Sequence, residues 1–453
     1  MKILIYGLNF APELSGAGKY TAEMAHMLTE SGHEVRVVCA PPYYPDWKVA
    51  DGYSMWRYRR DTIGGMRVWR APLWVPPRPS GLKRMLHLAS FALCSLPLLA
   101  RQVAWRPGAV ILIAPTMACA PGALALARVT GAKAWLHVQD YEVDAAFDLG
   151  LLKSARAARA AYWIERVVLK RFDVVSSITG QMVERAVSKG VDRTRTEFLP
   201  NWVDTRHIFP LDRVSEYRET LGIPASHTVV LYSGAIGAKQ GIETLADAAA
   251  ALAARDDITF VFCGNGGGRA DLVKRCEGLS NCRFLPLQPV SSLNELLNIA
   301  DIHVLPQRSD AADLVMPSKL TGMLASGRAV IAMARPDTAL YEAVSNNGVI
   351  VPPEDTAALV DAIAALAEDD ARRAAIGAAG RRYAETMLSP LSTLLTLDTR
   401  LALLTGGVAA ASAGASASTV DATGAGVPGA APVATPLGNG PILSARVEES
   451  EVE

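Results

Sequence analysis

Short apolar segments alternate with helix-length amphipathic segments through most of the chain, and this alternation limits the folds that it can adopt. The apolar segments of the first half are KILIYGL, EVRVVCA, GAVILIA, AKAWLHV and residues 173–178. Those of the second half are TVVLYSG, ITFVFCG, CRFLPL, DIHVLPQ, RAVIAMA and GVIVPP. Strands separated by helices pair in parallel, with helices on both faces of the sheet. The sequence therefore predicts an α/β protein with two Rossmann-like, doubly wound parallel sheets.

The alternation is interrupted at PNWVDTRHIFPLD, where two prolines and an Asn-Trp pair favour a linker. We therefore expect a first domain over residues 1–203 and a second over 204–385. A helical pattern at 386–405 predicts a separate C-terminal helix.

After this helix the composition changes to Ala, Gly, Ser, Pro and Val, and Asp421 is the only charge between Gly406 and Ala445. Such a segment buries too little side-chain surface to offset the entropy lost on ordering. Residues 406–453 are predicted to form a disordered tail.

Charge and cysteine usage narrow the functional classes. The 453 residues include 45 basic and 45 acidic side chains, and this balance argues against a nucleic-acid partner. Six cysteines occur without a C-x-x-C pair, and the chain opens on MKILIYG instead of a signal-peptide pattern. We expect a cytoplasmic protein.

A glycine-rich loop follows the first strand of each of the two predicted sheets. One is LNFAPELSGAGKYTAEMAHML, which contains Gly16 and Gly18, and the other is YSGAIGAKQGIETL. Phosphate binding needs converging backbone N–H groups and benefits from a helix N-terminus and a positive charge. The second loop has the residues for this, namely Gly234, Gly237, Lys239 and Gly241. A tight strand-to-helix turn with an exposed lysine is the other interpretation of this loop.

Two further strands of the second half end in ligand-binding patterns. CGNGGGR contributes Gly264 and Gly266, and PQRSDAADLVMPSKLTGMLASG contributes Asp313, Pro317, Ser318 and Lys319. Because the carboxyl ends of parallel strands meet at one edge of a sheet, we expect these segments to face one crevice.

The first half contains HVQDYEVDAAFD, in which Asp140, Glu142 and Asp144 alternate. Extended, they would share one face, as metal ligands do. The segment leads into a helical region, where acidic residues serve as caps, and we favour this interpretation and predict no metal site. His137 and Asp140 lie at the carboxyl end of a predicted strand and are candidate catalytic residues in the crevice of the first domain. A structural role for the histidine is the alternative.

Residues 56–84 are rich in arginine, lysine and aromatic side chains, and the apolar run MLHLASFALCSLPLLA follows at once. The run is shorter than the ~20 residues of a membrane span. Basic and aromatic residues beside an apolar helix favour a membrane-facing segment over 56–100. An ordinary core helix preceded by a solvated basic loop is the alternative.

The order of these segments, together with PNWVD and FLPLQP, resembles family 4 of the glycosyltransferases, and within it a bacterial subgroup of fucosyl- and N-acetylfucosaminyltransferases. The resemblance implies a GT-B architecture of two Rossmann-like domains that face a cleft. The nucleotide sugar would bind mainly to the C-terminal domain and the acceptor mainly to the N-terminal one.

Site residues are implied by the same resemblance. Lys239 and Lys319 would be catalytic groups that stabilise the departing diphosphate. Donor-binding residues would be Gly16, Gly18, Gly234, Gly237, Gly241, Gly264, Gly266, Asn201, Asp313, Pro317 and Ser318.

The chain departs from the family pattern at two places. The basic residue that usually follows the strand-ending glycine is here Ala235 or Ile236, and the Glu-x7-Glu pattern is absent, its second glutamate falling on Gly322. The ribose contact of that glutamate would then be either lost or supplied by Asp310 or Asp313, and Lys319 would compensate by its charge at the phosphates.

The leading hypothesis is a retaining glycosyltransferase without a cofactor. It would use a GDP- or UDP-linked sugar, such as a fucose-type sugar, and a polyprenyl-diphosphate-linked saccharide in exopolysaccharide or O-antigen assembly. It would work at the inner face of the cytoplasmic membrane, with no nucleic-acid partner. A non-catalytic GT-B scaffold and a nucleotide-sugar epimerase or dehydrogenase are the two alternatives.

Overall fold

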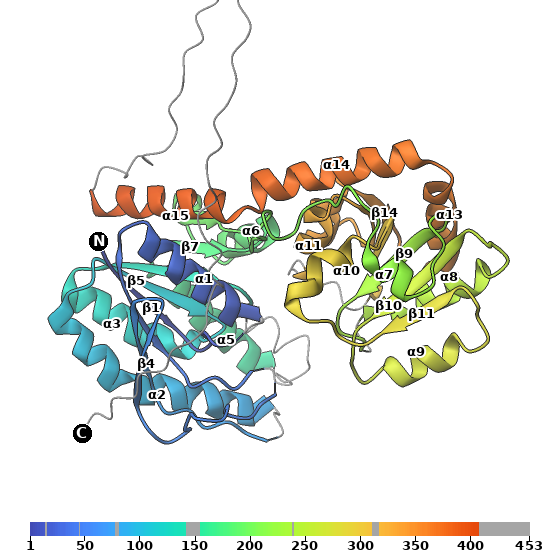
Figure 1. The fold of residues 1–453 in the computed structure, drawn as a ribbon. Coiled ribbons are helices and arrows are strands. Elements are labelled where there is room, and N and C mark those ends of the chain that lie inside the picture. Colours follow the sequence, from blue (N-terminus) through green and yellow to red (C-terminus); the bar gives the residue numbers. More distant parts are fainter. Residues whose placement is uncertain are drawn as a thin grey trace, which may run out of the picture.

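Two sheets of mostly parallel strands form the centre of the protein, one in each half of the chain (Figure 1). The computed structural model describes residues 1–13, 16–44, 46–77, 81–141, 155–237, 240–309 and 317–406. The predicted pair of doubly wound sheets is confirmed. The tail predicted over 406–453 lies outside the described residues from 407 onwards.

The first sheet has the strand order β3-β4-β2-β1-β5-β6-β7-β8. Its strands are β1 (Lys2–Gly7), β2 (Glu34–Cys39), β3 (Arg59–Ile63), β4 (Met66–Arg70), β5 (Ala109–Ala114), β6 (Lys133–Val138), β7 (Val174–Ser177) and β8 (Thr196–Phe198). Every pairing among these described strands is parallel except that of β3 with β4. The strand order reverses between β1 and β5, which places a crevice at their carboxyl ends.

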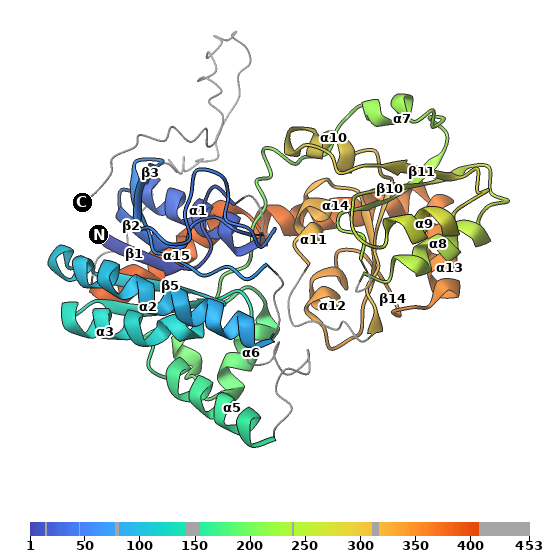
Figure 2. The same cartoon turned by 90° about the horizontal axis from the view of Figure 1, so that it is seen from below.

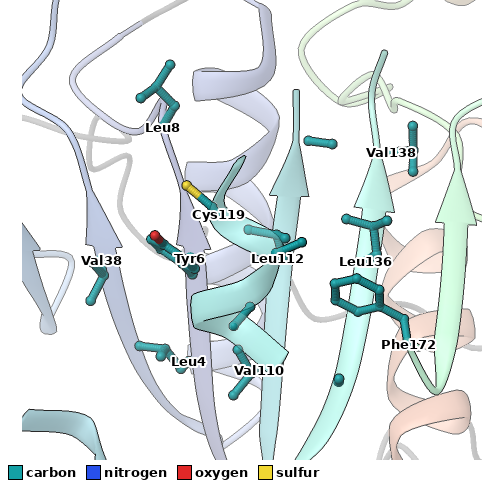
Figure 3. Packing of buried hydrophobic residues seen from close by; sticks show 14 of the residues in the cluster. Leu4, Tyr6, Leu8, Val38, Val110, Leu112, Cys119, Leu136, Val138 and Phe172 are labelled. Atoms are coloured by element: carbon teal, nitrogen blue, oxygen red, sulfur yellow. The ribbon is translucent and has the colours of Figure 1, made fainter. Parts of the chain in front are cut away.

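Helices cover both faces of the first sheet. They are α1 (Gly16–Glu30), α2 (Gly81–Trp105), α3 (Ala120–Thr130), α5 (Ala155–Leu169) and α6 (Gly180–Ser188). Side chains alternate along β1, so that Leu4 and Tyr6 join the cluster under α2 and α3 (Figure 3), whereas Ile3 and Ile5 pack with α1. Figure 2 shows α2 and α3 side by side on their face.

The second sheet has the strand order β11-β10-β9-β12-β13-β14. Its strands are β9 (Thr228–Ser233), β10 (Ile258–Cys263), β11 (Cys282–Leu285), β12 (Ile302–Leu305), β13 (Ala329–Met333) and β14 (Val349–Val351). Its helices are α7 (Glu216–Thr220), α8 (Ile242–Ala251), α9 (Arg269–Arg275), α10 (Leu293–Leu297), α11 (Lys319–Ala325), α12 (Ala339–Val344), α13 (Thr356–Ala367) and α14 (Asp370–Met387). The order reverses between β9 and β12, so the second crevice lies at the ends of these two strands.

The C-terminal helix returns to the first half of the chain. In Figure 1, α14 and α15 (Pro390–Thr405) follow one another, α14 over the second sheet and α15 beside α1. Leu397 and Leu401 of α15 belong to the same buried cluster as Ile3 and Ile5. His33 Nε2 also lies 2.8 Å from a carboxylate oxygen of Asp398. The last helix is therefore part of the packing of the first sheet.

The basic and aromatic segment before α2, residues 56–80 of the chain, contains two strands that the sequence analysis did not predict. Residues 59–70 form the β3–β4 hairpin at the edge of the first sheet. Arg70 is only 1% exposed, and its guanidinium donates to Asp61 and to the backbone carbonyls of Ala40 and Ala11. Arg70 is therefore not part of an exposed basic surface, because carboxylate and carbonyl oxygens of the protein accept its N–H groups. The membrane contact predicted for the rest of the segment stays a prediction.

Helix α2 has one side in the core and one exposed apolar side, so it has features of both a core helix and a membrane-facing helix. Phe91, Leu98 and Leu99 are buried in the core of the first domain, whereas Leu86 and Leu93 face solvent. Among the described residues, one helix, Lys83–Trp105, is long and apolar enough to cross a membrane by length and composition. It packs against α3 as one layer of the domain, so these two properties do not make it a membrane span.

Candidate active site

The loop after β1 is organised around a buried carboxylate. Glu13 is 7% exposed and accepts hydrogen bonds from the backbone N–H groups of Tyr43 and Tyr44 and from the side chain of Asn9, at 2.9–3.0 Å. Burial raises the pKa of Glu13, and these hydrogen bonds oppose the rise. The carboxylate fixes the loop after β1 to the loop after β2.

Glu13 also accounts for one of the predicted glycines. A Cβ at Gly18 would lie 2.7 Å from Glu13 Oε2, so only glycine leaves room for the carboxylate. Gly16, with φ +59°, begins α1 and lies under the ring of Tyr44. The contact of Gly16 and Gly18 with the donor stays a prediction. The carboxylate of Glu13 beside Gly18 makes this position unfavourable for a phosphate.

The loop after β9 is organised around a lysine instead. Lys319, the first residue of α11, is partly buried and extends to the end of β9, where its ammonium donates to the hydroxyl of Tyr232 at 2.8 Å. A Cβ at Gly234 would lie 2.5 Å from Lys319 Cε and 2.8 Å from Nζ. The predicted residues Gly234 and Lys319 thus meet at the point where the strand order of the second sheet reverses.

Lys319 carries a charge that no described residue neutralises. No acidic side chain in the described part of the chain pairs with its ammonium, and burial lowers the pKa of Lys319 to about 8. A partly buried cation without an anion is unfavourable, and a bound anion removes this penalty. The end of β9 is therefore suited to an anionic ligand.

The glycines after β10 serve the contact between two loops. Gly264 (φ +150°) and Gly266 (φ +148°) would place a Cβ 1.8 Å from Gly234 O and 2.1 Å from Ile236 O. Backbone hydrogen bonds join the same loops, from Gly234 N to Cys263 O and from Ile236 N to Asn265 O, both at 2.9 Å. The two glycines therefore hold the β9 loop in place, and nothing in their geometry requires direct contact with a donor.

The remaining predicted donor residues lie around the same strand ends. Gly241 (φ +61°) is the N-cap of α8, and its α-carbon faces the backbone of Gln307 and Arg308 beyond β12. Gly237 lies in the β9 loop and is partly exposed, and Pro317 and Ser318 immediately precede Lys319. Lys239 and Asp313, together with the alternative Asp310, lie outside the described residues.

His137 is part of a buried polar network in the first domain. It is 2% exposed, and its ring nitrogens lie 2.9 Å from Ser176 Oγ and 3.1 Å from Gln139 Nε2. Gln139 in turn exchanges amide hydrogen bonds with Asn201. Burial lowers the pKa of His137 to about 4, so the ring is neutral at physiological pH. This geometry gives His137 and Asn201 a positioning role between β6, β7 and the linker, and their predicted contact with substrate stays a prediction.

Asp140 lies two residues beyond β6 and is exposed, whereas Glu142 and Asp144 lie outside the described residues. In the part of the chain that the structure describes, no group of three His, Cys, Asp or Glu side chains is placed to hold a metal ion. The roles predicted for Asp140 and for the acidic segment remain predictions.

The two loops approach one another across the halves of the chain. Burial raises the pKa of Tyr20, on α1, to about 12, and a hydrogen bond with Thr321 of α11 opposes this rise. Tyr20 follows Gly18 by two residues and Thr321 follows Lys319 by two. The start of α1 therefore lies beside the start of α11, and the two strand-end crevices face a common space.

Sequence reasoning did not identify Glu13 or Tyr232 as site residues. Glu13 lies five residues before the predicted Gly18, and Tyr232 lies two residues before the predicted Gly234. The sequence shows each of them only as a polar side chain in an otherwise apolar strand or loop. The role of Glu13 depends on Tyr43 and that of Tyr232 on Lys319, and both partners are distant in the sequence.

Comparison with known proteins agrees with this arrangement. Residues 15–202 match a family described as glycosyl transferase 4-like domain, and residues 214–383 match the family of glycosyl transferases group 1. The chain is 45% identical over 375 residues to WcaI of Escherichia coli K12, a glycosyl transferase assigned to colanic acid biosynthesis, and the match covers 80% of this chain and 91% of WcaI. A D-inositol 3-phosphate glycosyltransferase of Xylanimonas cellulosilytica is 28% identical over 48% of this chain and 54% of that protein.

Solved structures show the same fold. Sucrose-phosphate synthase from Thermosynechococcus elongatus superimposes with a TM-score of 0.67 at 18% identity, over 89% of this chain and 99% of that one. Anabaena HepE in complex with UDP and glucose gives a TM-score of 0.60 at 16% identity, over 89% and 100%. Of the three functional interpretations left open by the sequence, the glycosyltransferase one is confirmed. With its GT-B architecture, this chain belongs to the family 4 glycosyltransferases.

Proposed function

We propose that this glycosyltransferase binds a nucleotide sugar at the ends of β9 and β12 and transfers the sugar to a saccharide carried on a lipid diphosphate. The observation that carries the proposal is the ammonium of Lys319, which faces the strand-end crevice with a hydroxyl as its partner and no pairing carboxylate among the described residues. A diphosphate is the part of a nucleotide sugar that would neutralise it.

The family implies a reaction with retention of configuration, and the placement of Lys319 supports one part of it. The glycosidic C–O bond to the donor diphosphate breaks, and a new C–O bond forms between the anomeric carbon and an acceptor hydroxyl, with retention of configuration. The proton of that hydroxyl passes to an oxygen of the leaving diphosphate. Lys319 stabilises the negative charge that develops on the diphosphate, which is the preorganised electrostatic stabilisation that lowers many enzymatic barriers.

The relatives guide the choice of substrates to test. WcaI is assigned to colanic acid biosynthesis, an exopolysaccharide pathway, and HepE was solved with UDP and glucose. For this chain we infer a role in exopolysaccharide or O-antigen assembly, with a UDP- or GDP-linked sugar, fucose-type sugars included, as donor.

A thermal-shift screen of the full chain against UDP, GDP, dTDP and their sugar conjugates tests the donor site. A ligand that binds only the folded state raises the melting temperature by mass action. We expect one nucleotide family to stabilise the protein, and that family identifies the base. If none of these nucleotides raises the melting temperature, the proposed donor site is refuted.

We further propose that the enzyme works on the inner face of the cytoplasmic membrane and contacts lipid through α2. Its outward side carries Met85, Leu86 and Leu93, which are 65%, 52% and 67% exposed. The helix contains Lys83, Arg84 and Arg101 and no acidic residue. An apolar stripe with basic neighbours is attracted to anionic lipid surfaces.

Sedimentation with phosphatidylglycerol-containing vesicles tests this surface. The variant Leu86→Glu/Leu93→Glu should lose binding, because two carboxylates replace apolar contacts on an exposed face without disturbing the core. Leu403→Glu is the matched control, since Leu403 is 69% exposed on α15. Equal sedimentation of wild type and the double variant would refute the lipid contact.

A further inference from the structure

Tyr232 is a buried tyrosine at the end of β9 whose hydroxyl makes two hydrogen bonds. It accepts from the ammonium of Lys319 at 2.8 Å and donates to the carbonyl of Ala235 at 2.5 Å. The ring is 0% exposed and packs in the core under α8. The rigid β-strand and this packing leave the hydroxyl a single position.

The lysine, in contrast, is a flexible side chain held at few points. Its ammonium lies 4.4 Å from the centre of the Tyr232 ring, and its final carbons fill the space that a side chain at Gly234 would occupy. The hydroxyl of Tyr232 is the hydrogen-bond acceptor that the structure gives its Nζ. The ring face limits where the ammonium lies, and the hydroxyl is the acceptor among the described residues that fixes the direction of its N–H groups.

The carbonyl on the other side of the hydroxyl belongs to the glycine loop itself. Positions 235 and 236 of this loop are Ala235 and Ile236, neither of which carries a charge. Among the described residues, the cation at the start of this loop comes from α11, and the hydroxyl of Tyr232 is the group that connects this cation to the loop backbone. The distance between Lys319 and the loop is thus set through Tyr232.

We propose that Tyr232 is a positioning residue of the donor site: its hydroxyl orients the Lys319 ammonium toward the donor diphosphate and ties it to the loop backbone at Ala235. The inference rests on the proposed function, because it assigns the diphosphate to the crevice in front of Lys319. Tyr232 acts through the lysine and does not itself contact the donor.

A double-mutant cycle on the full chain tests this coupling, with UDP and GDP as probes in calorimetric titrations. Tyr232→Phe keeps the ring and removes only the hydroxyl, and should weaken nucleoside-diphosphate binding by about tenfold, because the loss concerns a hydrogen bond to a charged group. In the Lys319→Met background the same change should alter binding by less than about twofold, because no ammonium is left to orient. An equal loss in both backgrounds would show direct contact with the ligand and overturn the proposal.

Tyr6→Phe is the matched control. Tyr6 is the equivalent residue of β1, is also 0% exposed, and shares its hydroxyl hydrogen bond with Ser95 instead of a cation. It should lower stability without changing nucleotide affinity. If the wild type binds neither UDP nor GDP, the proposed function fails together with this inference. If the wild type binds and Tyr232→Phe binds equally well, only the inference fails.

The pH dependence of binding gives a readout that a merely structural role would not change. Among the described residues, Tyr232 is the titratable group that faces Lys319. Removing a hydroxyl that accepts from the ammonium disfavours its charged form and lowers the pKa of Lys319 further. We expect the alkaline loss of nucleotide affinity to begin at lower pH in Tyr232→Phe than in wild type. An unchanged profile would argue against the coupling.

Discussion

The loops after β1 and β9 occupy equivalent places in two similar sheets, yet they are built around opposite charges. The loop after β1 encloses Glu13, whose oxygens accept three hydrogen bonds from the protein. The loop after β9 encloses Lys319, whose ammonium has a tyrosine hydroxyl as its partner. The carboxylate of the first loop has its hydrogen-bond partners within the protein, whereas the cation of the second has no anionic partner among the described residues.

This difference indicates which half binds the anionic part of a substrate. Both loops have glycines at matching places, and the pattern alone suggests two phosphate sites. The glycine at 18 makes room for a carboxylate, and the glycine at 234 makes room for a lysine. A phosphate is repelled by the first and attracted by the second, so we assign the donor diphosphate to the second sheet and the saccharide part of the acceptor to the first.

The largest effect on stability is expected at the backbone contact between the loop after β9 and the loop after β10. Gly264→Ala places a methyl group 1.8 Å from Gly234 O at a positive φ, and should lower the free energy of unfolding by about 3 kcal/mol or more. Gly267→Ala is the control, because a Cβ there meets no atom within 4 Å. Urea denaturation measures both. Similar midpoints for the two variants would show that the loops are not held together as described.

The substitution Lys319→Met removes the positive charge that α11 places beside the second loop. The variant should bind nucleoside diphosphates about 10–100-fold more weakly, because a charge-assisted phosphate contact is lost. Turnover should fall at least as much, since the charge on the diphosphate grows in the transition state. Lys274→Met, an exposed lysine on α9, is the control for loss of a positive charge in the same domain. Full activity of Lys319→Met would remove the proposed donor site.

The first loop should respond in stability and not in donor binding. Glu13→Gln replaces an acceptor oxygen with an N–H₂ group facing Asn9, and should destabilise the protein by about 1–2 kcal/mol. The double variant Asn9→Asp/Glu13→Gln restores an acceptor opposite that N–H₂ group and should recover part of the loss. Affinity for UDP and GDP, measured by calorimetry, should stay within about twofold of wild type, because hydrogen bonds of this loop stay within the first domain. A loss as large as that of Lys319→Met would contradict the assignment of the diphosphate to the second sheet.

The sequence predicted the strands and glycine loops because these depend on local patterns: apolar runs of strand length and glycines at positions that require a positive φ. It did not predict what the glycines accommodate, since the partner of Gly18 is Glu13 and that of Gly264 is the backbone of another loop. The β3–β4 hairpin was missed because its arginines suggested an exposed surface, whereas Arg70 is buried on Asp61. The packing of α15 on the first sheet depends on contacts between residues far apart in sequence, such as His33 with Asp398, which are 365 residues apart.

The smallest effect, and a direct measure of the unneutralised charge, is the pH dependence of stability. Burial lowers the pKa of Lys319 from 10.5 to about 8. Between these values the unfolded lysine keeps its proton and the folded one loses it, so the unfolded state binds more protons and stability rises with pH. The charged lysine therefore destabilises the ligand-free protein below pH 8, and this effect disappears as the pH approaches 10.5.

Lys319→Met should be more stable than wild type at pH 7 by about 1 kcal/mol, after allowance for partial exposure, and the difference should shrink between pH 8 and 10.5. Denaturation of both proteins across this range cancels the titrations that they share. A constant difference would mean that the ammonium is already neutralised by the protein, and the contrast between the two loops would then be one of residue type and not of charge.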